Sequence, residues 1–521
     1  MFFPLRLGRV SMIKKVLHFF LLDRNRLIAL ALGALMVAAH APVGLVPIAL
    51  ISLAGLFWLW QQVDTQKAAI QIGFWYGIGF FGVGVSWLIS SIYIYAGVHL
   101  ALSILATTIF VLFLTSYFML AGWLVAWLKR PGQLGVNWAL LMPTVWVLAE
   151  ALRASLFGGF PFLLTGNTHA LTWLGGYAPL LGVLGVSWVV AISAGVLLWL
   201  VISRSWVLAP MILAVFWLSG AALKNVEWVE ADGKPVKVAL IQGNIPQDQK
   251  WLQEQFLPTL QTYVSLTKQH LDADVVVWPE TAIPDYYDRV EKGALRNFIR
   301  DAQLLNTDIL VGVITRDLAT KAYYNAIVNV HQPDQVYQKR HLVPFSEFFP
   351  FTDLFKALSL LFDVPFSSFS AGEDDQAPFQ LGVHKVGMSV CYEMAFGEEL
   401  AISAIQSDYL LTVSNDAWFA HTLEPAQQVQ DVQMRALELG REIARTTNTG
   451  YTVIVGVDGQ IKQSIEAYQT GVLRGEVQPY RGETPFMTWR QWPVFGLLAL
   501  VLAVLVVNRW RFKKEMHLET T

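Results

Sequence analysis

Apolar runs of bilayer-spanning length fill residues 27–223 and return near the end of the chain. A helix crosses the hydrocarbon core of a membrane with roughly 17 to 25 apolar residues. Charged residues are scarce in these runs but reach an ordinary globular density over residues 224–490. The whole chain is 55% hydrophobic and only 15% charged, a composition typical of membrane proteins. The sequence therefore predicts a membrane domain, then a soluble domain, then a final anchor.

We predict seven membrane-spanning helices before the soluble domain and an eighth after it. The run over residues 27–60 is interrupted only around His40 and Pro42, so it forms either one long helix or two short ones. A cleavable signal peptide ending at Ala39-His40-Ala41 is the alternative for this segment, but the apolar spans that follow at once favour a retained helix. The expected spans cover residues 27–41, 43–60, 69–90, 98–128, 136–152, 180–203, 206–223 and 491–508.

Basic residues in the connecting segments predict the orientation in the membrane. Lys and Arg accumulate on the cytoplasmic side, and seven spans place all the basic clusters on one side and the soluble domain on the other. In a bacterial inner membrane, that other side is the periplasm. The basic residues are Arg6, Arg9, Lys14, Lys15, Arg24, Arg26, Lys129, Arg130, Arg204, Arg509, Arg511, Lys513 and Lys514. The predicted parts are a cytoplasmic segment 1–26, a membrane domain 27–223, a periplasmic catalytic domain 224–490, an anchor 491–508 and a cytoplasmic tail 509–521.

Glu150 and Arg153 are the main ionisable pair within the apolar runs, and their spacing puts them on one helical face. We expect a mutually satisfied pair near a helix end, because a pump or carrier would show several such groups along a pathway. The loop over residues 157–162 is apolar and rich in glycine, and it is a candidate to dip back into the lipid surface.

The soluble segment alternates strands and helices. Its mostly apolar strands predict a sheet covered on both faces, hence a layered α/β domain. There is no glycine-rich phosphate loop, and no basic patch interleaved with aromatic residues suggests a nucleic-acid partner. Strands are expected over residues 237–242, 274–278, 309–314, 323–330, 386–390, 409–414 and 451–457, and helices over 253–270, 295–305 and 425–445.

Cys391 is the only cysteine, so the chain forms no intramolecular disulfide. It follows the apolar run Val386–Val390 and precedes a polar, helix-starting segment. We therefore expect it at a strand-to-helix turn, where backbone N–H groups favour the thiolate that a nucleophile needs. The alternative is a buried cysteine that acts as a small hydrophobic residue. Candidate partners elsewhere in the chain favour the nucleophile.

Glu280 and Lys339 are these candidate partners. Glu280 follows an apolar strand, and ligands of open α/β sheets bind at the carboxyl ends of the strands. A carboxylate there can take a proton from a thiol, although a helix-capping glutamate is the alternative. Lys339 belongs to a basic cluster followed at once by the apolar run Leu342–Phe345, so we expect it to be pinned against the core. A fixed ammonium stabilises a thiolate and an oxyanion, whereas a solvated turn is the alternative.

Four ordered segments resemble the nitrilase superfamily with its Glu, Lys, Cys triad. They are Trp278–Glu280, Lys339–Glu347, Ser389–Glu393 and Ser414–Trp418. With membrane spans on both sides, nearly the whole chain resembles the apolipoprotein N-acyltransferase family. The resemblance implies a nitrilase-like αββα sandwich inserted between the seventh and eighth transmembrane helices of an α-helical membrane domain. It implies no cofactor, and no His/Cys/Asp cluster with metal-ligand spacing suggests a metal.

The resemblance also assigns roles within the candidate triad. It makes Glu280 the general base, Lys339 the stabiliser of the oxyanion and Cys391 the nucleophile. An acyl chain would pass from a phospholipid, through a thioester on Cys391, to the α-amino group of a diacylated apolipoprotein. A monomer is expected, since nothing in the sequence demands a dimer. One alternative is a membrane-tethered amidase, in which water attacks the thioester. A second, outside enzymes, is a transporter or a scaffold. Eight membrane spans favour a protein that acts on lipids.

Four further positions match the family. The resemblance makes Glu347 a support for the lysine that also meets the incoming amine, and it makes the Tyr392 backbone N–H an oxyanion donor. Glu393 matches a position beside the cysteine. Trp251 matches a tryptophan of the mobile, substrate-side region. Ser346 is a small departure, because it stands where family members have glycine.

Overall fold

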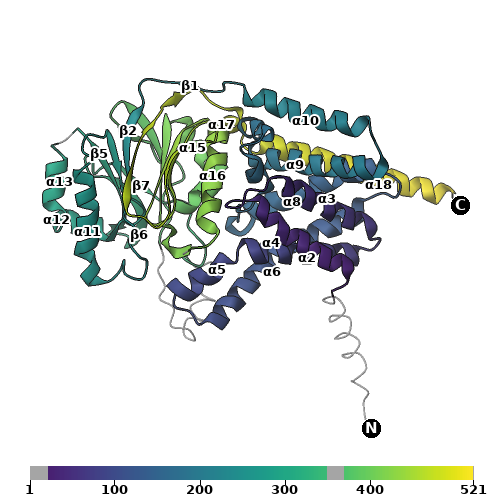
Figure 1. Ribbon diagram of the computed structural model, residues 1–521, viewed down its shortest axis with the longest axis horizontal. Helices are drawn as coiled ribbons and strands as arrows, with labels where there is room; N and C mark the ends of the chain where they lie inside the picture. The colour runs from purple at the N-terminus through teal and green to yellow at the C-terminus, as the bar shows by residue number, and fades with distance from the viewer. Residues whose placement is uncertain (1–21, 305, 349–368, 420, 520–521) are drawn as a thin grey trace, which may run out of the picture.

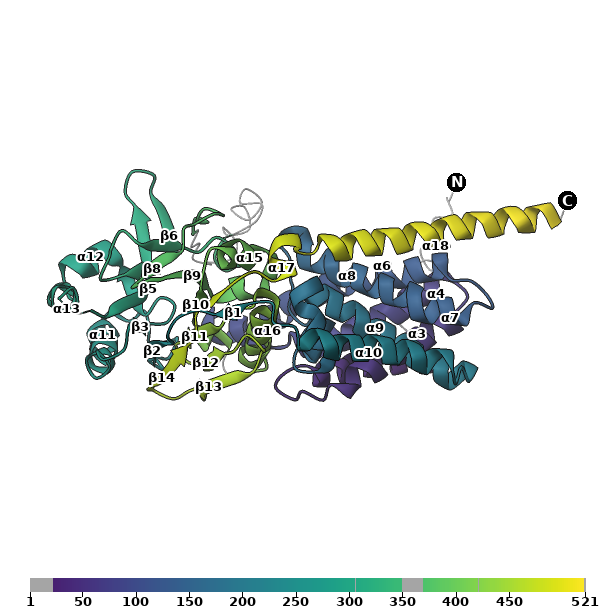
Figure 2. The same ribbon diagram turned by 90° about the horizontal axis from the view of Figure 1, so that it is seen from above.

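The computed structural model describes residues 22–304, 306–348, 369–419 and 421–519. An α/β domain and a bundle of helices lie end to end (Figures 1 and 2). The chain first builds the bundle, then forms the α/β domain, and returns along the bundle as α18 (Trp492–Glu519). Of the basic residues used to predict orientation, Arg6, Arg9, Lys14 and Lys15 lie outside the described residues.

Among the residues that the structure describes, eight main helices form the bundle. In the described part of the chain, four stretches are long and apolar enough to cross a membrane: Leu100–Leu128, Leu134–Gly158, Trp173–Ser203 and Trp492–Arg511. Gln66–Gly84 with Trp87–Tyr95, bent by 49°, would be a fifth. The run over residues 27–60 forms two helices rather than one. The main helices are α2 (Arg24–Met36), α3 (Pro47–Gln62), α4 (Gln66–Gly84), α6 (Leu100–Leu128), α8 (Met142–Ser155), α9 (Ala178–Ser203), α10 (Leu208–Lys224) and α18.

Glycine allows the central helices of the bundle to pack closely. At Gly73 in α4, a Cβ atom would lie 2.2 Å from the carbonyl oxygen of Phe118 in α6. Small residues at such positions let helix backbones approach each other, which is how helices associate in lipid. Pairs α4 with α6 and α2 with α4 make the most extensive contacts of the bundle.

Glu150 and Arg153 are both buried in α8, but each binds the loop that follows the helix. Glu150 Oε1 accepts hydrogen bonds from the Thr165 backbone N–H and hydroxyl, both at 2.8 Å. The Arg153 guanidinium donates to the carbonyl oxygens of Phe160 at 2.6 Å and Phe162 at 2.5 Å. The expectation of a mutually satisfied pair is therefore wrong: within the described part of the chain no hydrogen bond or ion pair joins the two side chains, and the loop supplies their partners through its backbone and the Thr165 hydroxyl.

The α/β domain contains two stacked sheets. The strands of the first sheet run in the order β14-β2-β3-β5-β6-β7, with β4 paired to β5, and those of the second in the order β13-β12-β11-β10-β9-β8. The first comprises β2 (Val236–Gln242), β3 (Val275–Val277), β4 (Ile283–Tyr286), β5 (Asp308–Asp317), β6 (Ala322–Asn329), β7 (Val336–Gln338) and β14 (Gly471–Val477). The second comprises β8 (Phe379–Leu381), β9 (His384–Val390), β10 (Tyr409–Ser414), β11 (Ile443–Thr447), β12 (Thr452–Val455) and β13 (Ile461–Ile465). A pair β1 (Glu230–Ala231) with β15 (Tyr480–Arg481) lies apart from both.

Helices cover the outer face of each sheet. Apolar side chains of the two sheets meet between them, for example Val277 and Val390. The outer face of the first sheet packs on α11 (Gln253–Lys268), α12 (Tyr287–Lys292) and α13 (Arg296–Ala302). The outer face of the second packs on α15 (Gly397–Ile405), α16 (Glu424–Leu439) and α17 (Pro485–Trp489). The domain is thus an αββα sandwich.

The helix predicted over residues 425–445 is too long. Helix α16 ends at Leu439, Gly440 adopts a left-handed conformation with φ 53°, and Ile443–Thr447 forms strand β11. Glycine takes this conformation without the strain that a Cβ atom would bring. The strand pairs in parallel with β10 in the middle of the second sheet.

Helix α16 joins the two domains, because it lies between the second sheet and the bundle (Figure 1). Asn167 Nδ2 donates to Asp431 Oδ1 at 2.5 Å, and the Val183 backbone N–H donates to Glu438 Oε1 at 2.6 Å. Burial raises the pKa of Asp431 and of Glu438 to about 7, although Arg435 counteracts the shift. The α/β domain therefore rests on the bundle through carboxyl groups that are almost out of contact with water.

We predict that Asp431→Asn makes the protein less sensitive to pH. A carboxyl whose folded-state pKa is raised contributes no penalty below its unfolded pKa of about 4, and an increasing penalty as the pH rises through about 7. The Tm of the wild type should therefore decrease between pH 5 and pH 8, and the Tm of the variant should decrease less over the same range. At pH 8 the unfolding free energy of Asp431→Asn should exceed that of the wild type by about 2 to 4 kcal/mol. Asp301→Asn, at an exposed position, is the control, and equal pH profiles for wild type and Asp431→Asn would contradict the prediction.

Candidate active site

Three strand ends bring Glu280, Lys339 and Cys391 to one edge of the sandwich. Glu280 lies three residues after β3, and Lys339 directly follows β7 in the same sheet. Cys391 directly follows β9 in the second sheet and opens the 3₁₀ turn Cys391–Ala395. The carboxylate and ammonium of the first sheet therefore face the thiol of the second, and both charges act on its titration.

Lys339 is 1% exposed, and two carboxylates surround its ammonium. Its Nζ lies 2.8 Å from Glu347 Oε1 and 3.7 Å from Glu280 Oε1. Burial alone would lower the pKa of Lys339, but Glu347 and Glu280 together raise it above its ordinary value. The lysine thus remains a fixed positive charge, as an oxyanion site requires.

Asn325 in β6 orders the two carboxylates. Its Nδ2 donates to Glu280 Oε1 at 2.6 Å and lies 3.3 Å from Glu347 Oε1. Glu347 Oε2 also accepts the Val343 backbone N–H at 2.8 Å. Asn325 was not predicted as a residue of the site. A polar residue among the buried positions of a strand was the one signal that could have found it.

Cys391 has a strained backbone and a thiol that resists ionisation. Its φ is 53°, in the left-handed region that residues with a Cβ atom rarely adopt, and its side chain is partly buried. Burial raises the pKa of the thiol, and the Glu280 carboxylate raises it further, whereas Lys339 lowers it. The net pKa lies above that of an ordinary cysteine. The expectation that the turn favours the thiolate is therefore wrong, and the thiol needs a base to become a nucleophile.

Glu393 connects the cysteine turn to the lysine loop. Its Oε1 accepts the backbone N–H groups of Arg340 at 2.7 Å and His341 at 3.2 Å. Its Oε2 accepts the backbone N–H of Val390 at 2.6 Å and the hydroxyl of Tyr337 at 2.9 Å. Since both oxygens are occupied and the side chain is fully buried, Glu393 positions the site rather than contacting a substrate.

Tyr392 and His341 extend from the site toward the bundle. The Tyr392 hydroxyl donates to the carbonyl oxygen of Gly159 at 3.0 Å, and its ring stacks on Phe162 at 5.8 Å. His341 Nε2 lies 3.0 Å from the carbonyl oxygen of Gly158. The loop over residues 157–162 thus contacts the residue after Cys391 as well as the loop that carries Lys339. Its Phe162 is 3% exposed, whereas Phe157 is 79% exposed.

Trp251 lies on the surface, with 53% of its side chain exposed. Its neighbour Lys250 is buried instead, and Lys250 Nζ donates to the main-chain carbonyl oxygen of Glu280 at 3.3 Å. Burial lowers the pKa of Lys250 to about 8, against the attraction of the Glu280 carboxylate. Lys250 was not predicted as a residue of the site, although its neighbour Trp251 was. No cluster of three or more His, Cys, Asp or Glu side chains suited to a metal occurs among the described residues.

Comparison with known proteins gives matches over both domains. Residues 32–196 match the family model described as apolipoprotein N-acyltransferase N-terminal domain, and residues 237–486 match the carbon-nitrogen hydrolase model. Apolipoprotein N-acyltransferase of Methylococcus capsulatus is 38% identical over 93% of this chain and 96% of its own length. The proteins of the same name from Nitrosomonas europaea and Azotobacter vinelandii are 37% and 39% identical, over 91% and 93% of this chain and 95% of each relative.

Glu280→Gln should lower the pKa of Cys391, because the Glu280 carboxylate raises it. We expect the midpoint pH of alkylation by iodoacetamide, followed by intact mass, to fall by about one unit. Because Cys391 is the only cysteine, the label reports on this thiol alone. Glu254→Gln on the surface of α11 is the control. An unchanged or higher midpoint would mean that the Glu280 charge does not act on the thiol.

Glu393→Gln should weaken both stability and catalysis. The amide replaces one acceptor oxygen by a donor and leaves backbone N–H groups without a partner, at a cost of about 1–3 kcal/mol each. We expect the unfolding free energy to fall by about 2–4 kcal/mol. The loss of alignment between the thiol and Lys339 should reduce turnover roughly a hundredfold. Thermal unfolding and a rate assay measure the two effects, with exposed Glu227→Gln as control. Wild-type turnover in Glu393→Gln would disprove the positioning role.

Proposed function

Because the chain belongs to the apolipoprotein N-acyltransferase family, we propose that it transfers an acyl chain from a phospholipid to an apolipoprotein. The acceptor is the free α-amino group of the N-terminal diacylglyceryl-cysteine, and the reaction is the last step of lipoprotein maturation. The observation that carries this proposal is the paired Lys339 ammonium and Glu280 carboxylate beside the thiol of Cys391. This arrangement suits acyl transfer through a covalent intermediate.

The first half-reaction acylates the enzyme. Glu280 takes the proton of the Cys391 thiol as the sulfur attacks an ester carbonyl carbon of the phospholipid. The need for this base is supported by the raised pKa of the thiol. Lys339 and the Tyr392 backbone N–H stabilise the oxyanion. The tetrahedral intermediate collapses by breaking the ester C–O bond, Glu280 returns the proton to the leaving alkoxide, and the lysophospholipid departs from the thioester.

The second half-reaction transfers the acyl chain to the amine. The neutral α-amino group attacks the thioester carbonyl carbon. We assign Glu347, which binds the Lys339 ammonium, to the contact with this amine on the strength of the family resemblance. Glu280 accepts a proton from the attacking nitrogen. When the C–S bond breaks, the sulfur leaves as thiolate and recovers that proton. The products are the N-acylated lipoprotein and the free enzyme, so the cycle is ping-pong.

The membrane arrangement is part of the proposal. We place the protein in the bacterial inner membrane as a monomer with eight spans, with the catalytic domain in the periplasm and both termini in the cytoplasm. Support comes from the basic residues at the far end of the bundle and from the position of the α/β domain between α10 and α18 in the chain. The proposed boundaries are 27–223 for the membrane domain, 224–490 for the catalytic domain and 491–508 for the anchor.

Intact mass spectrometry of the protein incubated with phospholipid alone tests the intermediate. We expect the mass to rise by one acyl chain, the added mass to map to Cys391, and a diacylated lipopeptide to remove it as N-acyl product. Cys391→Ala should show neither adduct nor product. Its matched control is Ser205→Ala, at the end of the bundle remote from the thiol.

Two other results would contradict the transferase. Free fatty acid released without lipopeptide acylation would make water the acceptor, as in an amidase or hydrolase. Normal transfer by Cys391→Ala would remove the thiol from the mechanism.

A further inference from the structure

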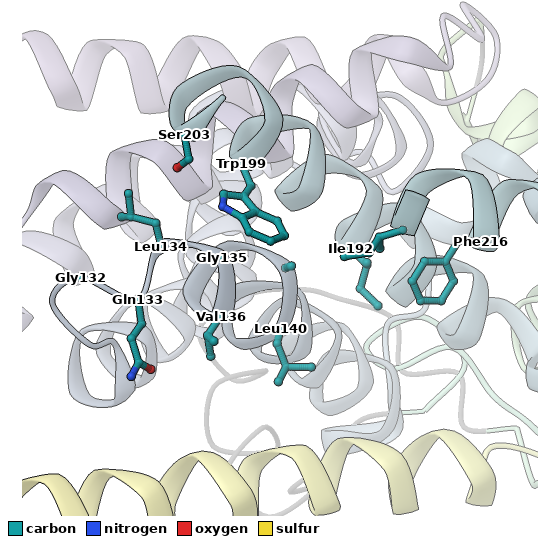
Figure 3. Close-up of a pocket in the computed structure, with 12 residues that line it drawn as sticks. Gly132, Gln133, Leu134, Gly135, Val136, Leu140, Ile192, Trp199, Ser203 and Phe216 are labelled. Atoms are coloured by element: carbon teal, nitrogen blue, oxygen red, sulfur yellow. The ribbon is translucent and has the colours of Figure 1, made fainter. Parts of the chain in front are cut away.

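A second lipid site is suggested by a cavity at the end of the bundle that faces away from the α/β domain. It has a volume of about 690 Å³, within the range of about 300–1,000 Å³ usual for small-ligand sites. It lies where the short helix α7 (Leu134–Val136) meets α9 and α10 (Figures 2 and 3). The catalytic groups lie in the other domain, so this cavity is separate from the active site.

The cavity has an apolar end and a polar end. Ile192 and Phe216 lie at one side of the view and Ser203 and Gln133 at the other, with Trp199 between them (Figure 3). Gly135 makes room for Trp199, since a Cβ atom there would lie 2.9 Å from the indole ring. An amphipathic molecule, with a chain at the apolar end and a polar group at the other, matches this division.

The cavity opens on the outer surface of the bundle. Val136 is 40% exposed, and Ser203 is exposed as well. A bundle that spans a membrane presents this surface to lipid. A lipid chain can therefore enter sideways from the bilayer without passing through water.

The polar end carries positive charge. Arg204 directly follows Ser203 at the end of α9 and is exposed, with φ 51°. Lys129 and Arg130 precede the loop that supplies Gly132 and Gln133 to the lining. The Lys129 ammonium donates to the carbonyl oxygens of Trp60, Gln61 and Val63, and Asp64, in the loop after α3, attracts it. Arg204 is therefore the cation that stands beside the hydroxyl of Ser203 and the amide of Gln133, a combination that suits a phosphate group.

We propose that this cavity binds an anionic glycerophospholipid of the leaflet farther from the catalytic domain. One acyl chain lies between α7, α9 and α10, and its end packs on Ile192 and Phe216. The phosphate lies at the polar end, near Ser203 and Arg204. The lipid is held and is not a substrate, because Cys391 lies in the other domain.

Photo-crosslinking of the full-length protein in lipid nanodiscs tests the site. The probes are phosphatidylglycerol and phosphatidylethanolamine with the same diazirine in one acyl chain. We expect crosslinks in peptides that cover residues 132–140 and 192–216. The phosphatidylglycerol probe should give about five times as much crosslinking as the phosphatidylethanolamine probe. Ala139→Phe fills the cavity and should abolish these crosslinks, whereas Ala106→Phe, on the exposed face of α6, should not.

Arg204→Gln tests the headgroup contact at an exposed position where folding is not at risk. It should reduce the preference for phosphatidylglycerol about fivefold, while Arg300→Gln on the α/β domain should leave it unchanged. Equal labelling by both probes in the wild type would overturn the anionic headgroup. Crosslinks outside the two peptides, or labelling that persists in Ala139→Phe, would overturn the site. Protein-to-protein crosslinks through these peptides would assign the cavity to a second copy of the chain instead.

Discussion

The buried ammonium of Lys339 is the constraint on which the catalytic end of the sandwich depends. A charge taken out of water must find its compensation within the protein. Glu347 and Glu280 provide it at 2.8 and 3.7 Å, and Asn325 keeps the two carboxylates from spreading apart. The same contacts set the reactivity of the site. A carboxylate that lies between a lysine and a thiol can compensate the charge of the lysine and accept the proton of the thiol.

A single carboxylate also unites the two sheets at this edge. Glu393 receives donors from the end of β9 and from the loop after β7, so thiol and ammonium cannot move independently. Farther from the chemistry, α16 serves as both the cover of the second sheet and the contact with the bundle. Its polar groups are mostly buried. Some have partners in the bundle, as Asp431 does with Asn167, and others in the α/β domain, as Gln428 does with Arg445. The catalytic domain is therefore part of the membrane protein rather than a module on a flexible stalk.

The sequence predicted the features that depend on residues close together in the chain. Continuous apolar runs located the buried strands, and β10 was predicted with the bounds it has, Tyr409–Ser414. Strand β11 was missed because Ile443–Thr447 continues the apolar spacing of α16, and only the conformation of Gly440 separates them. The sequence predicted Glu280 and Cys391 at the ends of strands and Lys339 pinned against the core; the structure brings the three together, with Lys339 at the end of β7, a strand that was not predicted. Asn325 and Lys250 escaped notice because their roles depend on contacts with residues distant in the sequence. The direction in which the pKa of the thiol shifts was predicted wrongly, because burial and the Glu280 carboxylate raise it more than Lys339 lowers it.

The loop over residues 157–162 has a consequence beyond packing. Arg153 in α8 holds the carbonyl groups of this loop, and the loop in turn meets Tyr392 and His341. Helix α8 is thereby connected, through this loop and its hydrogen bonds, to the residue that follows Cys391. Helices tilt when the thickness of the bilayer changes. Through this loop, a tilt of α8 would have a direct mechanical path to Tyr392, the residue that follows Cys391.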